Sequence, residues 1–483
     1  MTREICASNP RFWGENDSET IQNAINYAEE MGLGEVVIPR RNERTGEHIW
    51  IISKTILLPS DITIILDNCH LRLADDVREN IFRNREAWTE KGNTLEGEQH
   101  DIRIMGIGHA VMDGGKPNGL CEQLHRDHPN EYPHMSVNLL IFLHNVRNFE
   151  VKNIQFIETR WWAMAFMFCR WGYIGNLDFR MYGNLENQDG VDLRIGCEYI
   201  TVENITGCTG DDTVALTCLP YLTDHFQSKL MVEGKTMDIH DVTIRNIISS
   251  AHGCGLLRFL CKGGARIYNV TVDGVKDTCE SISGMTILFG VAGYGSRPHS
   301  MDDFFNITIR NVTSCAKHAI FFNEPMKNVL IENVTTYGPN EIGLRFSENF
   351  ECENFVLRNL NVASNEEDLD CGIWMDVNDE RRLEDFHIER VRIPSQANYV
   401  MRGTKLDVED LLYAEPKQGF FTEEKAVLSK AYGRYHKYSN GKEILNRPKD
   451  NRFDGTLRDF RYLVKPYPIQ AIETKQEKKE GQC

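Results

Sequence analysis

Several features that would assign a protein to a familiar class are missing from this sequence. None of its 14 cysteines forms a Cys-x-x-Cys pair, which disfavours a structural zinc site. No run approaches the roughly 18 uninterrupted apolar residues of a membrane-spanning helix. The N-terminal segment has no basic stretch followed by an apolar core, so we expect neither export nor membrane insertion, and we predict a cytoplasmic protein.

Positive charge is also scarce. Lys and Arg number 54 against 71 Asp and Glu, and the net charge of -17 argues against nucleic acid as a partner. Disulfides are rare in proteins that are not exported, so we expect reduced cysteines that pack as small hydrophobic residues beside strand-like runs. With 41% hydrophobic residues, the chain can still bury an extended core.

From Asn148 onward the chain repeats a short pattern in which an apolar residue, any residue, Asn and an apolar residue follow one another. A short pattern that recurs along the chain is typical of a solenoid. It predicts an all-β, single-stranded parallel β-helix from about Val36 to about Ile393. Asn tolerates a left-handed backbone, and stacked Asn side chains hydrogen-bond from coil to coil, so we assign these residues a structural role. The repeated Asn stands at Asn153, Asn176, Asn204, Asn246, Asn311, Asn333 and Asn359, and Gly274 replaces it once.

An amphipathic helix is predicted at residues 17–33, before the first strand. Its apolar residues recur at helical spacing, Asp17 or Ser18 is expected to cap it, and Gly32 or Gly34 to end it. We expect this helix to cover the open end of the first coil, where unpaired strand edges would otherwise invite aggregation.

Polar stretches interrupt the solenoid. Residues 74–101 and 116–136 are expected to be long loops on the binding face, and the insertion 218–238 is expected to wall off one end of a cleft. The repeat stops near Asn398, so we predict a catalytic domain at 1–415. We expect residues 416–483 to form a C-terminal extension that packs on the solenoid or on a partner, for example a second copy of the chain. We expect this extension to end in a disordered tail.

Two short acidic motifs mark the candidate site. Asn187-Gln188-Asp189-Gly190 and Gly210-Asp211-Asp212 each precede a short apolar run, and Asp189 and Asp211 are 22 positions apart, about one coil. Carboxyls stacked in this way cannot all ionise, so at least one pKa must rise. An acid and a base are thereby brought together, as glycoside hydrolysis requires.

These motifs resemble the signature of the family 28 glycoside hydrolases, the polygalacturonase group of right-handed parallel β-helix enzymes. That signature is Asn-Thr-Asp, Asp-Asp, Gly-His-Gly and Arg-Ile-Lys. Asn187-Gln188-Asp189, Asp211-Asp212 and Ala251-His252-Gly253 resemble the first three elements, with Gln for Thr and Ala for the first Gly. The fourth is missing from residues 283–288, so the basic pair that grips a uronic carboxylate in that family has no counterpart.

The resemblance implies roles for these residues. Asp211 would be the general acid, and Asp189 with Asp212 would hold and activate the attacking water, with inversion at the anomeric carbon. His252 would hydrogen-bond the acid. No metal and no cofactor are implied, and the residues alone leave open which aspartate holds the proton, because coupled carboxyls titrate as a group.

Four further residues are candidates for binding substrate: Asn187, Arg194, Arg258 and Trp162. Asn187 opens the first motif, and Trp162 resembles an aromatic residue near the site of that family. Arg194 and Arg258 stand in apolar, strand-like runs, where an arginine needs a partner. A ligand and a carboxylate on a neighbouring coil remain equal alternatives for both arginines.

The sequence therefore predicts a glycoside hydrolase that acts from the end of short uronic-acid-containing or pectin-derived oligosaccharides. Long polygalacturonan is disfavoured, because the basic pair is missing and the net charge of -17 repels a polyanion. One alternative is a polysaccharide lyase on the same solenoid, which would use the aspartates as calcium ligands. A carbohydrate-binding solenoid without catalysis is the other, although binding alone gains nothing from crowded carboxyls.

Overall fold

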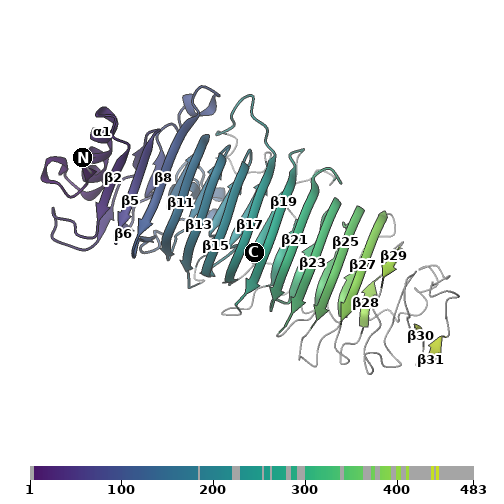
Figure 1. The fold of residues 1–483 in the computed structure, drawn as a ribbon. Coiled ribbons are helices and arrows are strands. Elements are labelled where there is room, and N and C mark those ends of the chain that lie inside the picture. The colour runs from purple at the N-terminus through teal and green to yellow at the C-terminus, as the bar shows by residue number, and fades with distance from the viewer. Residues whose placement is uncertain are drawn as a thin grey trace. The chain divides into compact units, whose positions relative to one another are not determined.

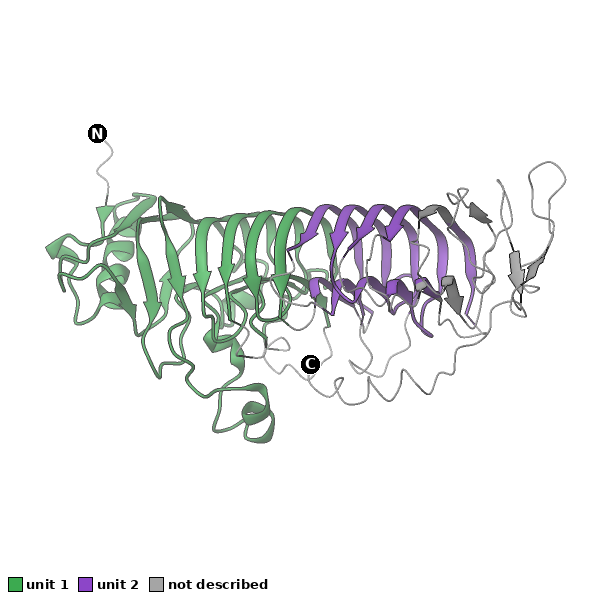
Figure 2. Ribbon diagram, turned by 90° about the horizontal axis from the view of Figure 1, so that it is seen from below, with its two compact units in different colours: residues 1–252 green, residues 253–483 purple. Residues whose placement is uncertain are grey.

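The computed structural model describes residues 5–182, 185, 187–219, 229–252, 255–261, 264–278, 284–290, 300–337, 342–362, 371–375, 381–392, 399–403, 410–412, 437–439 and 442–444. They are almost wholly β, and parallel strands follow one another coil after coil (Figure 1). This confirms the predicted parallel β-helix. The chain divides into two compact units, residues 1–252 and 253–483 (Figure 2). No helix in the described ranges is long and apolar enough to cross a membrane.

Two parallel sheets build the first unit. In the sheet of longer strands, alternate side chains point into the core, which gives the alternating burial seen along β11 and β13. Its strands are β1 (Ile5–Cys6), β2 (Glu35–Pro39), β3 (Trp50–Ile52), β5 (Ile62–Asp67), β6 (His70–Leu73), β8 (Gln99–Ile107), β9 (Val111–Asp113), β11 (Val146–Ile157), β13 (Arg170–Arg180), β15 (Glu198–Thr209) and β17 (Ile239–Ala251). The sheet of short strands carries β4 (Ile56–Leu58), β7 (Phe82–Asn84), β10 (Ile141–His144), β12 (Met164–Met167), β14 (Val191–Arg194) and β16 (Val214–Cys218).

The second unit repeats this arrangement. One sheet consists of β19 (Ile267–Asp277), β21 (Phe304–Ser314), β23 (Met326–Thr336), β25 (Cys352–Val362), β27 (Leu383–Arg392) and β29 (Asp410–Leu412). The other consists of β18 (Gly255–Cys261), β20 (Met285–Phe289), β22 (His318–Phe322), β24 (Ile342–Phe346), β26 (Cys371–Met375) and β28 (Tyr399–Gly403). An antiparallel hairpin, β30 (Lys437–Ser439) with β31 (Lys442–Ile444), is described further along. The rest of the predicted extension 416–483 and the boundary near residue 415 lie outside the described residues, so this domain division stays a prediction.

The repeated asparagines form the predicted ladders. Each of the seven has a positive φ, between 54° and 61°. In the second unit Asn333 donates to the Oδ1 of Asn311 at 3.1 Å and accepts from Asn359 at 2.9 Å. Asn176 and Asn204 are bonded in the same way in the first unit, at 2.9 Å. The structural role expected for these residues is therefore confirmed.

Asn333→Ala is expected to destabilise the protein more than Asn333→Gly. Both variants lose the side-chain ladder, but only Ala carries the Cβ penalty of a left-handed backbone, about 1–2 kcal/mol. Glycine adopts a φ of 58° without that penalty. Chemical denaturation of both variants measures the difference, and equal losses of stability would show that the backbone conformation costs nothing here.

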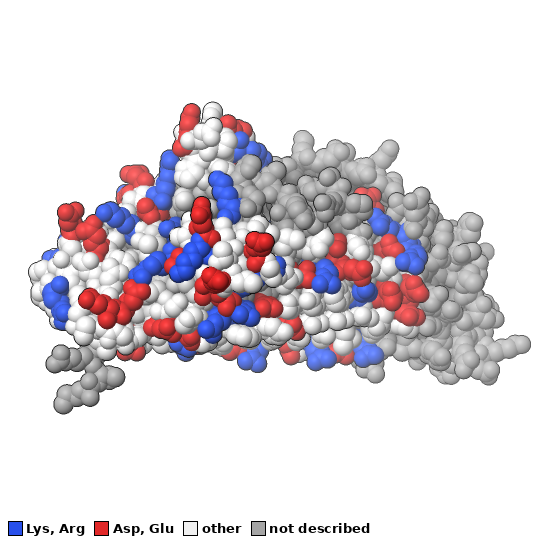
Figure 3. Space-filling view, turned by 90° about the horizontal axis from the view of Figure 1, so that it is seen from above, with Lys and Arg blue, Asp and Glu red and all other residues white. Residues whose placement is uncertain are grey.

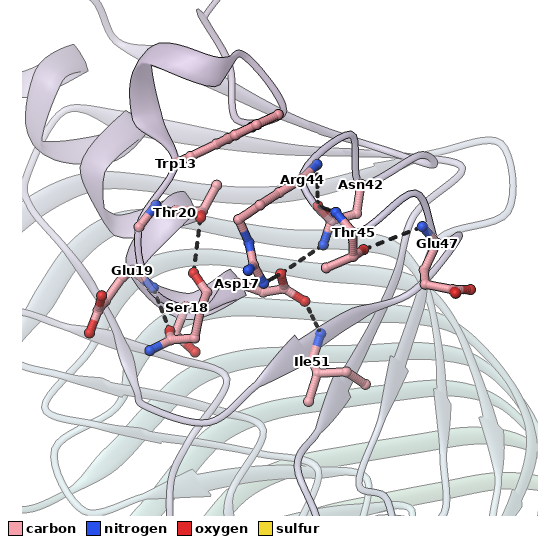
Figure 4. Close-up of polar contacts among 12 residues, drawn as sticks. Trp13, Asp17, Ser18, Glu19, Thr20, Asn42, Arg44, Thr45, Glu47 and Ile51 are labelled. Carbon is pink, nitrogen blue, oxygen red and sulfur yellow. Dashed lines mark hydrogen bonds and ion pairs between the residues drawn. The ribbon is translucent and has the colours of Figure 1, made fainter.

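The predicted N-terminal helix is α1 (Asp17–Glu30). Its cap is Asn16, whose Oδ1 accepts from the Glu19 amide at 2.9 Å, so the expected caps Asp17 and Ser18 are wrong. The Asp17 carboxylate instead turns inward and accepts from the Asn42 side chain at 2.7 Å and the Ile51 amide at 2.8 Å (Figure 4). It therefore ties α1 to the first coil. That α1 protects the open end stays a prediction.

The loop predictions hold only in part. The stretch 74–101 contains strand β7 and a 3₁₀ turn at Lys91–Asn93, which its high charge concealed. The stretch 116–136 contains the short helix α2 (Glu122–Asp127). Nine of the described cysteines are free thiols, but Cys315 is disulfide-bonded, so the expectation of reduced cysteines is wrong at that position.

Charges of both signs are interspersed on the face seen in Figure 3. In the second unit, for example, Glu332 lies 3.1 Å from Arg310 and 3.6 Å from Arg358. In the first unit Glu98 lies 2.8 Å from Arg170 and 2.6 Å from Lys235. The negative net charge is therefore not spread as a uniform acidic face over these strands.

Candidate active site

The two acidic motifs meet at one corner of the first unit, where successive coils enter the short-strand sheet. The Gly190 amide donates to the Asp212 carbonyl at 2.9 Å, and the Asp211 amide donates to the Gln188 carbonyl at 3.3 Å. Glycines permit this closeness. A Cβ on Gly190 would lie 2.5 Å from the Thr213 carbonyl oxygen, and one on Gly210 would lie 2.6 Å from the Gln188 Cβ.

A chain of hydroxyl groups fixes the second motif. Thr209 donates to the Asp211 carbonyl at 2.7 Å and contacts the Thr213 hydroxyl at 3.0 Å. Thr213 in turn contacts the hydroxyl of Ser249 on β17 at 3.2 Å. The backbone that carries Asp211 and Asp212 is thus held by its own coil and by the next one.

The structure brings the three predicted carboxyls to this corner. Asp189 and Asp212 are 5% and 2% exposed, and Asp211 is half-buried. Asp211 is therefore the most accessible of the three. That position suits the group expected to protonate a leaving oxygen, although the division of roles stays a prediction.

Asp192 is a fourth carboxyl, which the sequence analysis missed. It lies on β14, is 1% exposed, and is paired with the Arg194 guanidinium at 3.6 Å. Burial raises its pKa well above the ordinary value; Arg194 opposes the rise, while Asp212 and Asp211 add to it. The available signal was an Asp inside the apolar run Val191–Ile195, directly after the first motif.

Asp192→Asn is expected to change how stability depends on pH. A folded-state pKa above the unfolded one means that the folded wild type loses stability as the pH rises from the unfolded pKa through the folded pKa. Asn has no proton to lose. The thermal midpoint of the variant minus that of wild type should therefore increase with pH. Scanning calorimetry over a pH series measures this difference, and a constant value would contradict the raised pKa.

Arg194 and Trp162 lie beside Asp192. The Arg194 guanidinium is 3.6 Å from the Asp192 carboxylate, and its central carbon is 4.4 Å from the centre of the Trp162 ring. Both side chains are buried, at 4% and 5% exposure. The structure shows Arg194 in an ion pair with a carboxylate on its own strand, and a substrate contact stays a prediction. Trp162 packs on Arg194 and presents no open face for a sugar.

His252 does not contact the predicted acid. Its Nε2 lies 3.3 Å from the Met181 carbonyl oxygen, and its amide donates to the Thr209 carbonyl at 3.0 Å. The expected hydrogen bond to Asp211 is therefore absent from the described contacts of His252. The imidazole also interacts electrostatically with Glu158. Motif order correctly placed the residue on the next coil, but it did not determine the direction of the ring.

Glu158 is a second residue that the sequence analysis missed. It follows β11 with a φ of 42°, uncommon for a residue other than glycine. Its carboxylate accepts from the Tyr182 amide at 3.1 Å, and the Gln188 side chain donates to the carbonyl of the next residue, Thr159, at 2.6 Å. Burial raises its pKa, and Asp113 adds to the rise. Gln188 thus connects Glu158 to the corner that holds Asp211.

The remaining predicted residues lie in different places. Asn187 begins the first motif with a φ of 57°, as a turn residue. Arg258 lies in the second unit on β18, in register with Leu288 of β20, and is 9% exposed. A substrate contact by either residue stays a prediction.

The described part of the insertion 218–238 is not beside the aspartates. Leu230 accepts from His144 at 2.7 Å, and Lys235 donates to the Phe168 carbonyl at 3.2 Å. These contacts lie at the carboxyl ends of β10 and β12, whereas the aspartates lie before the amino ends of the short strands. The predicted wall at the site is therefore wrong for residues 229–238, and residues 220–228 lie outside the described part.

One group of possible metal ligands is found among the described residues. Ligand atoms of Asp61, His100 and Asp101, one from each residue, lie within 4.8 Å of one another. The lyase alternative, in which the aspartates are calcium ligands, stays a hypothesis that chelation would test.

Neither a family model nor a curated protein matches the chain. Solved structures do. The pre-mature bacteriophage phi29 gene product 12 matches with a TM-score of 0.58 and 14% identity, over 85% of this chain and 52% of that one. PfbA, a surface adhesin of Streptococcus pneumoniae, matches with a TM-score of 0.52 and 12% identity, over 92% and 100%.

A hyperthermoactive exopolygalacturonase from Thermotoga maritima has a TM-score of 0.48 and 16% identity, over 75% of this chain and 92% of that one. This chain spans about half of the phage protein that it matches. The phage protein and the adhesin show the β-helix fold of this chain. At such identities none of these likenesses shows an activity.

Proposed function

We propose that this protein is a glycoside hydrolase that inverts the anomeric carbon and acts from the end of short oligosaccharides, pectin-derived ones among them. One observation carries the proposal. Asp189 and Asp212 are held on adjacent coils by the hydrogen bond from the Gly190 amide to the Asp212 carbonyl, with Asp211 beside them. An inverting hydrolase needs a carboxylic acid and a carboxylate on opposite sides of the scissile bond, and crowded carboxyls supply both protonation states.

The loops support a site at this corner. The Arg160 guanidinium, two residues after Glu158, donates to the carbonyls of Ala74 at 2.7 Å and Val77 at 2.8 Å. The stretch 74–101 therefore begins beside the coil that precedes the first motif, where a loop can shape a binding face. We propose short substrates because the chain lacks the basic pair described above and carries a net charge of -17.

A substrate screen tests the proposal. Purified protein is incubated with neutral and uronic disaccharides and trisaccharides and with polygalacturonan, and products are followed by reducing-sugar assay and mass spectrometry. We expect monosaccharide from at least one short substrate. A ladder of intermediate oligomers from polygalacturonan, formed faster than monosaccharide from the short substrates, would contradict exo-action. An ultraviolet-absorbing product that disappears with chelator would favour the lyase alternative.

A further inference from the structure

The corner holds more carboxyls than the proposed reaction uses. Besides the three predicted aspartates, it includes the buried Asp192 and the half-buried Glu158. Asp113 lies on the coil before Glu158, in register with Ile157 of β11, and interacts electrostatically with Glu158. Acidic groups therefore line this corner of the first unit on successive coils.

The arginines of this region face protein acceptors. Arg194 pairs with Asp192, as described above, and Arg160 donates to two backbone carbonyls. Arg72 lies 2.7 Å from Asp75 and 3.6 Å from Asp113. Within the described residues of the first unit, each of these three guanidinium groups already contacts an acceptor of the protein. Their contacts therefore do not direct them toward the carboxylate of a ligand. A bound anion would therefore meet an excess of negative charge.

The hydrogen-bonding pattern of the corner also indicates that an anionic ligand is unfavourable there. Two buried oxygens of the corner, Oε1 of Gln188 and Oδ1 of Asp211, receive no hydrogen bond from any described residue, and the Asp192 carboxylate is 3.6 Å from its partner Arg194. A buried acceptor without a donor is unfavourable, so a ligand that supplies donors is favoured here. Sugar hydroxyls are donors. A carboxylate offers only acceptors at neutral pH, so it would leave these buried oxygens without a donor.

We infer that the site takes an uncharged sugar ring and rejects a uronate ring, and that Glu158 is a specificity-determining residue. This inference rests on the proposed function and decides what the sequence left open, whether the ring at the corner carries a carboxylate. Glu158 is suited to this role because the Gln188 side chain donates to the carbonyl of the next residue, Thr159, at 2.6 Å, and the Gln188 carbonyl accepts from the Asp211 amide. Its carboxylate therefore lies on the coil before the first motif, and Gln188 connects that coil to the catalytic corner.

The test compares ligands that differ only in the carboxylate. Isothermal titration at pH 7 measures the Kd of galactose against galacturonate, glucose against glucuronate and mannose against mannuronate. We expect at least one neutral sugar to bind about tenfold or more tighter than its uronate partner, a difference of about 1.4 kcal/mol. Glu158→Gln removes the charge while keeping the shape, so it should shrink that ratio severalfold.

A matched control comes from β11, the strand that Glu158 follows. Glu150 on β11 pairs with Lys152 at 2.6 Å on the long-strand sheet, and Glu150→Gln changes the net charge equally. It is expected to leave the ratio unchanged. A uronate that binds as tightly as its neutral partner, or a ratio unmoved by Glu158→Gln, would overturn the inference.

These outcomes separate the inference from the proposed function. If the protein prefers uronates and still cleaves a glycoside, the inference about charge fails and the hydrolase proposal stands. If none of the six sugars binds and no matched glycoside is cleaved, both fail together.

Discussion

Asp211→Asn is expected to lower kcat/KM for a susceptible glycoside by roughly 10² to 10⁴-fold, the usual contribution of a general acid. Asp211 is the most accessible of the three predicted carboxyls, and Asn cannot donate the proton that the leaving oxygen needs. Steady-state kinetics on the best substrate of the screen measures the effect. If Asp211→Asn retained most of the activity, the assignment of the acid would be wrong.

The thermal midpoint of the same variant shows whether a loss of activity comes from the lost acid or from unfolding. Asp211→Asn removes a charge that repels Asp192 and its neighbours, so its thermal midpoint should equal or exceed that of wild type. Asp127→Asn, on the exposed end of α2, removes the same charge away from the corner and should leave kcat/KM unchanged. A large fall in the midpoint of Asp211→Asn would mean that lost activity reports unfolding.

Phe322→Ala is expected to cost about 3–5 kcal/mol of unfolding free energy, which is usual when a buried aromatic residue is replaced by Ala. Phe322 is fully buried in the second unit, and its ring centre lies 5.5 Å from that of Phe289 and 4.7 Å from that of Phe346. The change removes the middle ring of this stack. The strands on either side are fixed by their ladders, so the cavity cannot close fully.

A half-buried phenylalanine of the same unit provides the control. Phe305 stacks on Tyr268 at 4.7 Å on the outer face of β21. Phe305→Ala should cost less than Phe322→Ala, because its ring already contacts solvent. Chemical denaturation measures both values. Equal losses would show that the stack of Phe322 is not part of a tightly packed core.

The fold could be predicted because its signals are local and repeated. Each Asn of the ladder adopts a positive φ, which Asn tolerates better than most residues. One such Asn is weak evidence for a turn, but its recurrence along the chain indicates a repeated coil. The acidic motifs could be placed on adjacent coils for the same reason, since their spacing matched the repeat. Where no repeat applied, prediction failed: the charge of 74–101 concealed β7, and the insertion 218–238 gave no indication of the strand ends that it contacts.

The composition of the corner could not be predicted fully, because side-chain direction is set by neighbours on other coils. Asp192 stands in an apolar run that predicts only a strand, yet burial beside Asp211 and Asp212 makes it a member of the carboxyl cluster. Glu158 precedes the first motif by 29 positions, and a contact between their coils is made by Gln188, which donates to the Thr159 carbonyl. The His252 ring is directed to the Met181 carbonyl, and no sequence motif indicates this contact.

The central claim is that crowded aspartates at one corner of the first unit hydrolyse a glycosidic bond with inversion. Proton NMR of the first sugar released, recorded before mutarotation, tests this claim most directly. We predict the anomer opposite to that of the substrate, formed by the wild type and not by Asp211→Asn. Release of the retained anomer, or of an unsaturated product, would contradict the account.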